Sequence, residues 1–507
     1  MPRYAAIDIG SNSVRMEAAE MEPGGPVRVL ASDREVTRLG EGVYRAGRIS
    51  AEAMELTCGV LARMAAAYQS LDVAGVRAVA TSSVRDARNQ AEFVERASQA
   101  AGTPVEVIPG REEARLIQLG VQARWPQPGQ RVLIIDLGGG SAEIIASENG
   151  RMLDAVSKPL GAVRLRAIFL AEDPPAERQL RQMQEYIQEK LAGLPRRFGM
   201  ARWNRVIATS ATAAAVACAI SGIPRSKRDR VDRIRVSAAQ VRRLFERLSG
   251  LDLAGRRRVS GIGPRRAEII VPGVAVLLDV LKSFELGHMH YSAAGVRDGI
   301  VADLAARGVG KERAQLSPEQ RKEVERLSHR YGVPVKHARK VAGLARTLFS
   351  SLQPLHQLPM ELGKLLEAAA YLHDVGHYVS DASHHRHSYY LVSNSDMPGF
   401  TNRERELIAN LCRYHRKSLP ARGRRSMSDG DGRALLKLIP LLRIADSLDR
   451  SHAQRIRSLT CHIQPGEVLI RLDSPVEVDL ELWAAERVGE VFREVYGRSV
   501  QVSRQSR

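Results

Sequence analysis

The segment Val132–Glu143 constrains the fold of this chain more than any other, because a run of apolar residues leads into an aspartate and three consecutive glycines. The apolar run predicts a buried strand that the glycines end. Glycines let backbone N–H groups turn toward a bound anion. Asp136 closes the strand and Glu143 follows the turn. Two carboxylates beside an anion-binding turn are typical of a Mg²⁺–phosphate site, although a simple tight turn in an α/β sheet is the alternative.

A second copy of this pattern lies near the N-terminus. The segment Tyr4–Arg15 has an apolar strand, then Asp8, then a glycine among hydroxyl and amide side chains. Two strand–Asp–Gly turns, each opening one half of an α/β region, indicate a duplicated fold. We therefore expect two lobes that hold phosphate between them.

Breaks in composition divide the chain further. Trp125–Gly129 contains two prolines and a glycine and predicts the boundary between the lobes. A linker near residues 307–316 precedes a nearly all-helical stretch, and mixed β and α signals return after residue 455. The expected parts are residues 1–124 (first lobe), 125–308 (second lobe), 309–455 (all-α) and 456–507 (small α+β domain).

Local signals place several elements. Capping boxes predict three helix starts, at Ser237 with Gln240, Ser317 with Gln320, and Thr401 with Glu404. A helix is expected over Ile269–Phe284, broken early by Pro272–Gly273. Strands are expected at Val468–Leu472 and Val476–Leu482, followed by a closing helix.

Charge points to a polyanionic partner. The 507 residues carry a formal net charge of +19. The basic residues of the second lobe cluster at Arg225, Lys227, Arg228, Arg230, Arg233 and Arg235, and at Arg256, Arg257, Arg258, Arg265 and Arg266. Aromatic residues make up only 5% and do not alternate with the basic ones, which disfavours nucleic acid and favours a phosphate polymer or a nucleotide. The alternative is an arginine-rich protein with solvated basic faces.

Other features favour a cytoplasmic protein with no membrane association. No apolar run reaches the roughly 18 residues of a membrane span. A strand begins by Tyr4, which leaves no room for a signal peptide. The four cysteines are scattered and are expected to be reduced.

Four motifs resemble those of the Ppx/GppA (exopolyphosphatase and guanosine pentaphosphate phosphohydrolase) family. They are DIGSNSVR at Asp8–Arg15, ATSSVRDARN at Ala80–Asn89, GREEARLI at Gly110–Ile117 and DLGGGSAE at Asp136–Glu143. LGAVRL at Leu160–Leu165, RAEIIVPG at Arg266–Gly273 and VRDG at Val296–Gly299 continue the match. The resemblance implies two actin-like (ribonuclease H-like) lobes of the actin/Hsp70/sugar kinase superfamily.

The resemblance also implies roles for individual residues. Glu113 would activate water, whereas from the residues alone Glu112 is an equal candidate that otherwise serves as a helix N-terminal charge. Asp136 and Glu143 would hold Mg²⁺, with Asp8 as a third candidate. Arg85 would clamp the transferred phosphoryl group, unless it is a surface arginine. The phosphate-binding candidates are Gly10, Ser11, Asn12 and Ser13 on one lobe, and Gly138, Gly139, Gly140 and Ser141 on the other.

The helical part resembles the HD-type domain of long exopolyphosphatases, through AYLHDVGH at Ala370–His377 and the histidine-rich segment His384–Glu404. The candidate metal ligands are His337, His373, Asp374, His387, His415 and Asp446. Imidazole and carboxylate together suit Mn²⁺, Fe or Zn²⁺. The alternative is a metal-free domain that serves dimerisation and polymer binding.

The chain departs from the family pattern at two places. Ala293 and Ala294 stand where many members have an acid and a glycine, and Ala208–Thr212 lacks a common glycine, which weakens the case for a nucleotide-base pocket. We expect a Mg²⁺-dependent exopolyphosphatase that acts on inorganic polyphosphate as a homodimer. The alternatives are hydrolysis of guanosine pentaphosphate (pppGpp), a non-catalytic regulator that binds an alarmone or polyphosphate, and a kinase or ATPase of the superfamily.

Overall fold

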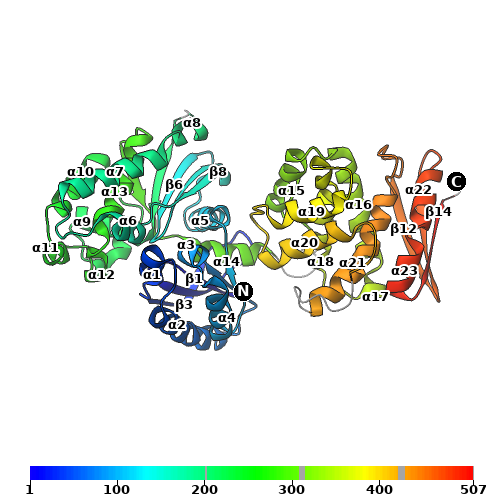
Figure 1. Cartoon of the computed structure of the whole chain (residues 1–507), viewed down its shortest axis with the longest axis horizontal. Coiled ribbons are helices and arrows are strands. Elements are labelled where there is room, and N and C mark those ends of the chain that lie inside the picture. Colours follow the sequence, from blue (N-terminus) through cyan, green and yellow to red (C-terminus); the bar gives the residue numbers. More distant parts are fainter. Residues whose placement is uncertain (200–201, 308–314, 421–428, 506–507) are drawn as a thin grey trace. The chain divides into compact units, whose positions relative to one another are not determined.

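The computed structural model describes residues 1–199, 202–307, 315–420 and 429–505. It divides into two compact units, Met1–Ala306 and Arg307–Arg507, which are described separately below (Figure 1). The finer division into four parts stays a prediction.

The first lobe of unit 1 is a five-stranded sheet in the order β3-β2-β1-β4-β5. Its strands are β1 (Arg3–Ile9), β2 (Val14–Glu20), β3 (Arg28–Glu35), β4 (Gly75–Ala80) and β5 (Val105–Val107). Its helices are α1 (Leu39–Ala46), α2 (Ala51–Gln69), α3 (Ser82–Asp86), α4 (Gln90–Ala101) and α5 (Gly110–Arg124). The first three strands are antiparallel, and β1, β4 and β5 are parallel. Strand β1 is apolar on both faces because Ala5 and Ile7 pack into one core and Tyr4 and Ala6 into another.

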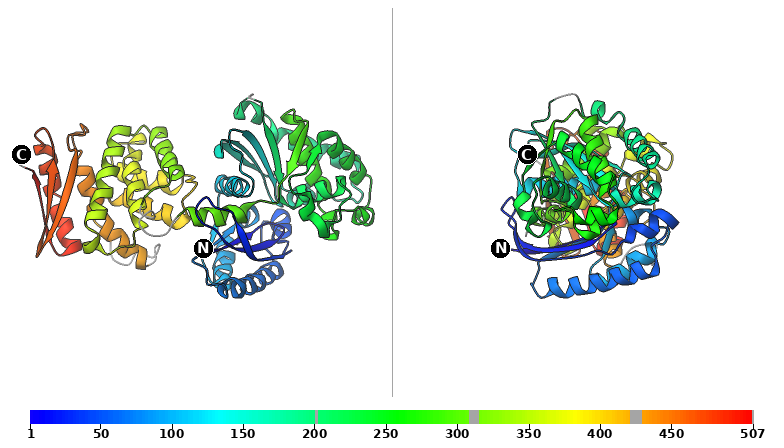
Figure 2. Two further views of the ribbon diagram at one scale, coloured as in Figure 1. Left: turned by 180° about the vertical axis from the view of Figure 1, so that it is seen from behind. Right: turned by 90° about the vertical axis from the view of Figure 1, so that its left-hand side faces the viewer.

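The second lobe repeats this order as β8-β7-β6-β9-β11, with β10 added at the edge. Its strands are β6 (Arg131–Leu137), β7 (Ala142–Glu148), β8 (Arg151–Lys158), β9 (Arg205–Thr209), β10 (Arg235–Ser237) and β11 (His288–Tyr291). Its helical segments are α6 (Ala162–Phe169), α7 (Glu177–Leu191), α8 (Leu194–Phe198), α9 (Ser210–Ile220), η1 (Arg225–Val231), α10 (Ala238–Ser249), α11 (Leu253–Arg258), α12 (Pro264–Ala267), α13 (Ile270–Ser283) and α14 (Val296–Ala306). The shared topology makes the two lobes a duplicated, actin-like pair, whose separate sheets are visible in Figure 2.

Helices α5 and α14 join the lobes through a common core. A Cβ atom added at Gly299 of α14 would lie 1.7 Å from the backbone oxygen of Leu116 in α5, so only glycine permits this crossing. The core between the sheets includes Ile134 and Ile207 of the second lobe and Val79 of the first. The two lobes are therefore packed into one unit rather than joined by a linker.

One helix differs from the sequence expectation. Pro272 and Gly273 lie inside α13 and do not break it. Pro272 is the third residue of the helix, where its missing N–H would have had no intrahelical acceptor. The expected break is therefore wrong, and α13 runs unbroken through the buried centre of the second lobe.

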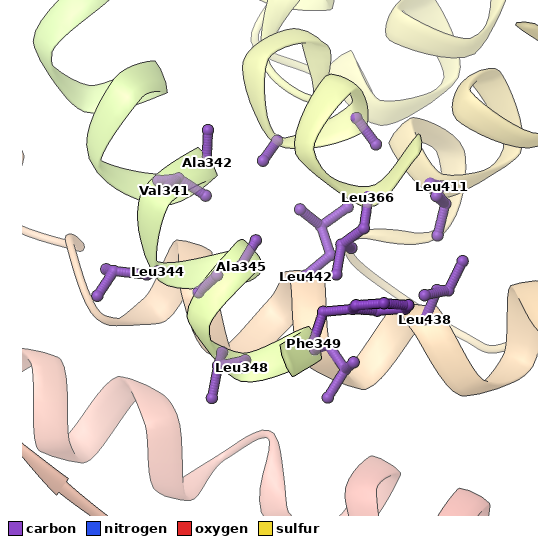
Figure 3. Packing of buried hydrophobic residues seen from close by; sticks show 14 of the residues in the cluster. Val341, Ala342, Leu344, Ala345, Leu348, Phe349, Leu366, Leu411, Leu438 and Leu442 are labelled. Carbon is purple, nitrogen blue, oxygen red and sulfur yellow. The ribbon is translucent and has the colours of Figure 1, made fainter. Parts of the chain in front are cut away.

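Unit 2 consists of a helical bundle and a three-stranded sheet. Its helical segments are α15 (Pro318–Arg330), α16 (Val335–Ser351), α17 (Gln353–His356), α18 (Leu362–Leu372), η3 (Val375–Tyr378), α19 (His384–Ser393), α20 (Asn402–Tyr414), α21 (Asp429–Ser447), α22 (Asp479–Glu486) and α23 (Gly489–Tyr496). The sheet contains β12 (Ser458–Gln464), β13 (Glu467–Asp473) and β14 (Ser499–Arg504) in the order β12-β13-β14. In the bundle core, Phe349 of α16 packs among Leu366, Leu411, Leu438 and Leu442 from three other helices (Figure 3).

The C-terminal elements differ in part from those expected from the sequence. All three predicted capping boxes are present, and β13 contains the predicted strand at residues 468–472. No strand forms at Val476–Leu482, because α22 begins within this segment at Asp479, and the last element is the strand β14. Asp479 and Glu481 lie in the first turn of α22, where carboxylates stabilise a helix through its dipole.

Candidate functional site

A cleft of about 860 Å³ lies between the lobes of unit 1, at the ends of the central strands. Asp8 and Asp136 occupy the next-to-last positions of β1 and β6. After each aspartate the chain makes the same turn. The N–H of Gly10 donates to the backbone oxygen of Ser13 at 3.1 Å, and the N–H of Gly138 donates to the backbone oxygen of Ser141 at 3.0 Å. The two sequence copies therefore face one cleft with equivalent geometry.

Close packing against the first lobe requires glycine at position 140 and leaves little room at Gly139. A Cβ atom on Gly140 would lie 1.9 Å from the hydroxyl oxygen of Tyr44, and one on Gly139 would lie 3.2 Å from the Cβ of Ser11. The N–H of Val163 at the start of α6 donates to the oxygen of Gly139 at 2.8 Å. All eight predicted phosphate-binding residues line the cleft, and their role in binding phosphate stays a prediction.

Glu113 lines the cleft, and Glu143 is buried nearby without lining it. Glu113, in the first turn of α5, and Glu143, on β7, are 6% and 0% exposed. The hydroxyl of Ser157 donates to Oε1 of Glu143 at 2.7 Å, whereas Oε2 of each glutamate has no hydrogen-bond partner among the described residues. Burial, and then the charge of Glu143, raises the pKa of Glu113 well above its ordinary value. Burial and the charge of Glu143 likewise raise the pKa of Asp136 to about 7.

These residues fit Mg²⁺. Oε2 of Glu113 and Oε2 of Glu143 are buried acceptors that receive no hydrogen bond from the described residues, and hard carboxylate oxygens are the ligands that Mg²⁺ prefers. Among the described residues, no three acidic side chains of the cleft have carboxylate oxygens that all lie within 4.8 Å of one another. Such spacing suits Mg²⁺, which keeps several waters and takes one or two carboxylates together with substrate phosphates. Asp136, Glu143 and Asp8 remain the predicted ligands.

The structure separates Glu112 from its neighbour Glu113. Glu112 points away from the cleft and accepts hydrogen bonds from Arg77 at 3.1 Å and from Arg115 at 2.8 Å. Asp303 of α14 accepts from the same two arginines at 3.0 and 2.8 Å. Burial alone would raise the pKa of Glu112, but the guanidinium of Arg115, and then that of Arg77, lowers it below the ordinary value. Glu112 is therefore part of a buried ion-pair cluster, and Glu113 is the glutamate available to the cleft.

Arg85, which is on α3, lies beside Glu113 of α5. Its Nη1 is 3.7 Å from Oε2 of Glu113, and it donates to the backbone oxygen of Ile108. The side chain is 28% exposed, so it is neither a free surface arginine nor fully committed to protein partners. Arg85 is not among the residues that line the cleft, and its role as a clamp on phosphate stays a prediction.

Three arginines gather on the cleft walls. Arg15 on β2 is directly opposite Arg34 on β3, and Arg266 on α12 adds a third charge. No ion pair joins these three to a carboxylate within the residues that the structure describes. Burial and the charges of Arg15 and Arg266 lower the pKa of Arg34 to about 9, and burial and Arg15 do the same for Arg266.

Like charges opposite each other on adjacent strands destabilise a sheet, so this arrangement indicates a polyanion as ligand. The sequence indicated Arg266 as part of a basic cluster. It did not indicate Arg15 or Arg34, because their pairing depends on the β2–β3 register, which shifts at Ala18 and Ala19.

The raised pKa of Asp136 leads to a testable pH dependence in the metal-free protein. Between about pH 4 and 7 the folded state keeps a proton that the unfolded state releases, so the unfolding free energy falls as pH rises through this window. Asn cannot ionise, so Asp136→Asn should be more stable than the wild type at pH 8 by up to about 4 kcal/mol, and equal to it below pH 4. Thermal melting in a chelator measures this difference. Added Mg²⁺ should narrow it, and a gap that does not change with pH would contradict the assignment.

In unit 2 the structure brings most of the predicted metal ligands together. His337, His373, Asp374, His415 and Asp446 converge at the ends of α16, α18, α20 and α21. His387 makes none of these contacts, and His384, one turn earlier on α19, takes its place. Sequence spacing could not distinguish the two, because the segment 384–387 contains three histidines.

No helix in the described ranges is both long and apolar enough to cross a bilayer.

Two family models match the chain: the Ppx/GppA phosphatase family over residues 18–307, and Ppx/GppA phosphatase domain III over residues 320–481. The PPX-GPPA enzyme of Aquifex aeolicus is 28% identical, and the match covers 59% of this chain and 99% of that one with a TM-score of 0.52.

An exopolyphosphatase from Cytophaga hutchinsonii is 26% identical, with 60% of this chain and 97% of that one covered and a TM-score of 0.55. An exopolyphosphatase-like protein is 27% identical over 60% of this chain and 98% of that one, with a TM-score of 0.56. The first family model alone spans more than half of the chain. With its duplicated lobes and the carboxylates between them, the chain therefore belongs to the Ppx/GppA phosphatase family.

Proposed function

We propose that this protein is a Mg²⁺-dependent exopolyphosphatase that removes terminal phosphate from inorganic polyphosphate in the cleft of unit 1. The observation that carries the proposal is the combination of clustered arginines on the cleft walls with two buried glutamates, Glu113 on the wall and Glu143 near it, that each have an oxygen without a hydrogen bond among the described residues. The carboxylates suit the reacting phosphoryl group and its metal, and the arginines suit the phosphates that follow it. The names of the similar solved structures support the same substrate class.

The reaction is an in-line attack of water on the terminal phosphorus. Glu113 accepts a proton from the water through its buried Oε2, the bond between phosphorus and the bridging oxygen breaks, and the shortened chain leaves with that oxygen. A pKa well above the ordinary value makes Glu113 a stronger base than a solvent-exposed carboxylate. Arg85, 3.7 Å from Glu113, is the candidate to bind the transferred phosphoryl group. Mg²⁺, when bound, neutralises negative charge on the phosphoryl oxygens.

The aromatic residues of the cleft favour a polymer over a nucleotide. Among the described lining residues, only Trp125 and Tyr291 are aromatic. The guanidinium groups of Arg205 and Arg233 lie 4.6 and 5.3 Å from the centroid of the Trp125 ring, and Tyr291 is only 6% exposed. Neither ring is open for stacking on a guanine base, whereas the arginines suit successive phosphates.

Comparison of substrates tests the proposal. Orthophosphate release is measured with Mg²⁺ on long-chain polyphosphate and on guanosine pentaphosphate, and we expect the larger kcat/KM with polyphosphate. A larger kcat/KM with guanosine pentaphosphate would overturn the proposal in favour of alarmone hydrolysis. Release from neither substrate would indicate a non-catalytic binding protein.

Arg34 offers a test of polymer binding that is separate from chemistry. Because Arg34 Nε is buried without a hydrogen-bond partner among the described residues, Arg34→Gln should raise KM for polyphosphate about tenfold, equivalent to one charge-assisted contact, and leave kcat nearly unchanged. The dependence of KM on salt should also become shallower. The matched control is Arg247→Gln, an exposed arginine of α10 outside the cleft. Equal effects of the two substitutions would contradict the role of Arg34.

A further inference from the structure

A cluster of histidines and aspartates lies in unit 2 and is independent of the cleft described above. Its members come from separate helices held by the bundle core shown in Figure 3. His337, His373, His384 and His415 are each no more than 3% exposed. Four buried imidazoles around the carboxylates of Asp374 and Asp446 require a physical explanation, since buried polar groups are costly unless they are satisfied.

The hydrogen bonds indicate which nitrogen of each neutral imidazole carries the hydrogen. The Nδ1 atoms of His373 and His415 lie 2.9 and 2.7 Å from the backbone oxygens of Ala370 and Cys412. A carbonyl oxygen only accepts, so each Nδ1 carries a hydrogen, and in the neutral ring that a metal ion requires each Nε2 presents a lone pair. His384 is held in the same way by the backbone oxygen of Asp381, at 3.3 Å.

His337 completes the pattern, with its Nδ1 2.9 Å from the carboxylate of Asp449. Its Nε2 is buried and has no hydrogen-bond partner within the described part of the chain. The Nε2 atoms of His384 and His415 meet at 3.2 Å. Lone pairs that converge in this way repel one another unless a cation lies between them, and outer acceptors on Nδ1 are the usual support of metal-bound histidines.

The distances sort the ligands into two groups that share Asp374. In one group, Oδ2 of Asp374 lies 3.8 Å from His337 Nε2 and 3.5 Å from His373 Nε2. Asp446 Oδ1 adds contacts of 3.7 and 3.3 Å to the same two histidines. Ligand atoms about 2.1 Å from one metal ion are separated by roughly 3 to 3.5 Å, so these spacings are close to a coordination sphere.

In the other group, Oδ1 of Asp374 lies 3.6 Å from His384 Nε2 and 3.8 Å from His415 Nε2. His377 Nε2 is 3.7 Å from the same oxygen, and its own Nδ1 contacts Asp381 at 2.6 Å. The two oxygens of one carboxylate thus face two sets of imidazoles. This is the arrangement of a carboxylate that bridges two metal ions.

A cavity of about 480 Å³ opens onto this cluster, and Asp374, His415 and Asp446 form part of its wall. Arg416 and Arg450 line the same cavity. Metal ions together with guanidinium groups bind phosphate oxygens, because both supply positive charge at short range. We propose that unit 2 contains a two-metal site, bridged by Asp374, that binds transition-metal ions and a phosphate group.

Cobalt binding to the full-length, metal-stripped protein tests the metal site. We expect the wild type to retain about two equivalents of Co²⁺ after desalting, with d–d absorption typical of nitrogen and oxygen ligands. His337→Gln removes a ligand from one group and His384→Gln removes a ligand from the other. Each variant should therefore retain about one equivalent of Co²⁺. The matched control is His387→Gln, on the same helix as His384, which should retain two. Glu143→Gln in the cleft should also leave the stoichiometry unchanged.

Retention of less than one equivalent by the wild type would overturn the metal site, as would equal binding by His337→Gln, His384→Gln and the control. If a variant fails to fold, the wild type alone decides: Co²⁺ should raise its melting temperature if it binds the folded state, and no shift would contradict the proposal. Inorganic phosphate should perturb the Co²⁺ absorption, and Arg416→Gln should weaken this effect about tenfold with the metal stoichiometry intact. An absorption unaffected by phosphate would overturn the phosphate-binding half.

Discussion

Replacement of Glu113 by Gln is expected to lower kcat for Mg²⁺-dependent phosphate release by about 10²- to 10⁴-fold, the range typical of a lost general base. Gln has nearly the shape of Glu but cannot accept a proton from water. Oε2 of Glu113 is buried, lacks a hydrogen-bond partner among the described residues and lies 3.7 Å from Arg85. No other carboxylate from α5 reaches the cleft, because Glu112 is held by Arg77 and Arg115.

The loss of activity should occur without loss of stability. The pKa of Glu113 is raised well above its ordinary value, so the folded state keeps a proton that the unfolded state has released. Ionisation of Glu113 therefore lowers the unfolding free energy as pH rises from about 4.5 toward its raised pKa, and Gln removes this penalty. Single-turnover phosphate release and thermal melting at pH 8 measure the two effects. If Glu113→Gln keeps full activity, the cleft is not the hydrolytic site and the histidine cluster of unit 2 becomes the next candidate.

The main architecture could be predicted from sequence because its signals are local. A buried strand that ends in Asp and Gly specifies its own turn, and the two copies of this pattern correctly indicated equivalent positions for Asp8 and Asp136. The capping boxes were also predictable, since Ser237 and Gln240 are three residues apart and the side chain of each accepts a hydrogen bond from the backbone N–H of the other.

What the sequence left open depends on contacts between distant segments. The choice between Glu112 and Glu113 is made by Arg77 and Asp303, which lie 35 and 191 positions from Glu112. The opposition of Arg15 and Arg34 requires the register of β2 against β3. Residue type and spacing carry no information on either.

The second large effect is expected at Glu112, where Glu112→Gln should lower the unfolding free energy by about 3 to 5 kcal/mol at pH 7. Glu112 is 2% exposed and accepts hydrogen bonds from both Arg77 and Arg115. Gln retains one acceptor oxygen but no charge, so two buried guanidinium groups are left with less compensation. Denaturant unfolding should show a loss of stability for Glu112→Gln and none for Glu113→Gln, whereas phosphate release should show the loss of activity for Glu113→Gln.

The pH dependence of the Glu112 effect follows from the lowered pKa of this residue. Its ionised form contributes stability above about pH 4.5, its unfolded-state value, and that contribution is lost as pH falls through the folded-state pKa. The deficit of Glu112→Gln should therefore be full at pH 7 and shrink in acid. The matched control is Glu106→Gln, whose side chain is 18% exposed and pairs with Arg77 at the edge of the same cluster, and whose cost should be about 1 kcal/mol or less. Equal costs at positions 106 and 112 would show that the buried position of Glu112 adds nothing. A larger cost at Glu112 would establish that the buried cluster, which ties α5 and α14 to the first sheet, stabilises the fold through charge.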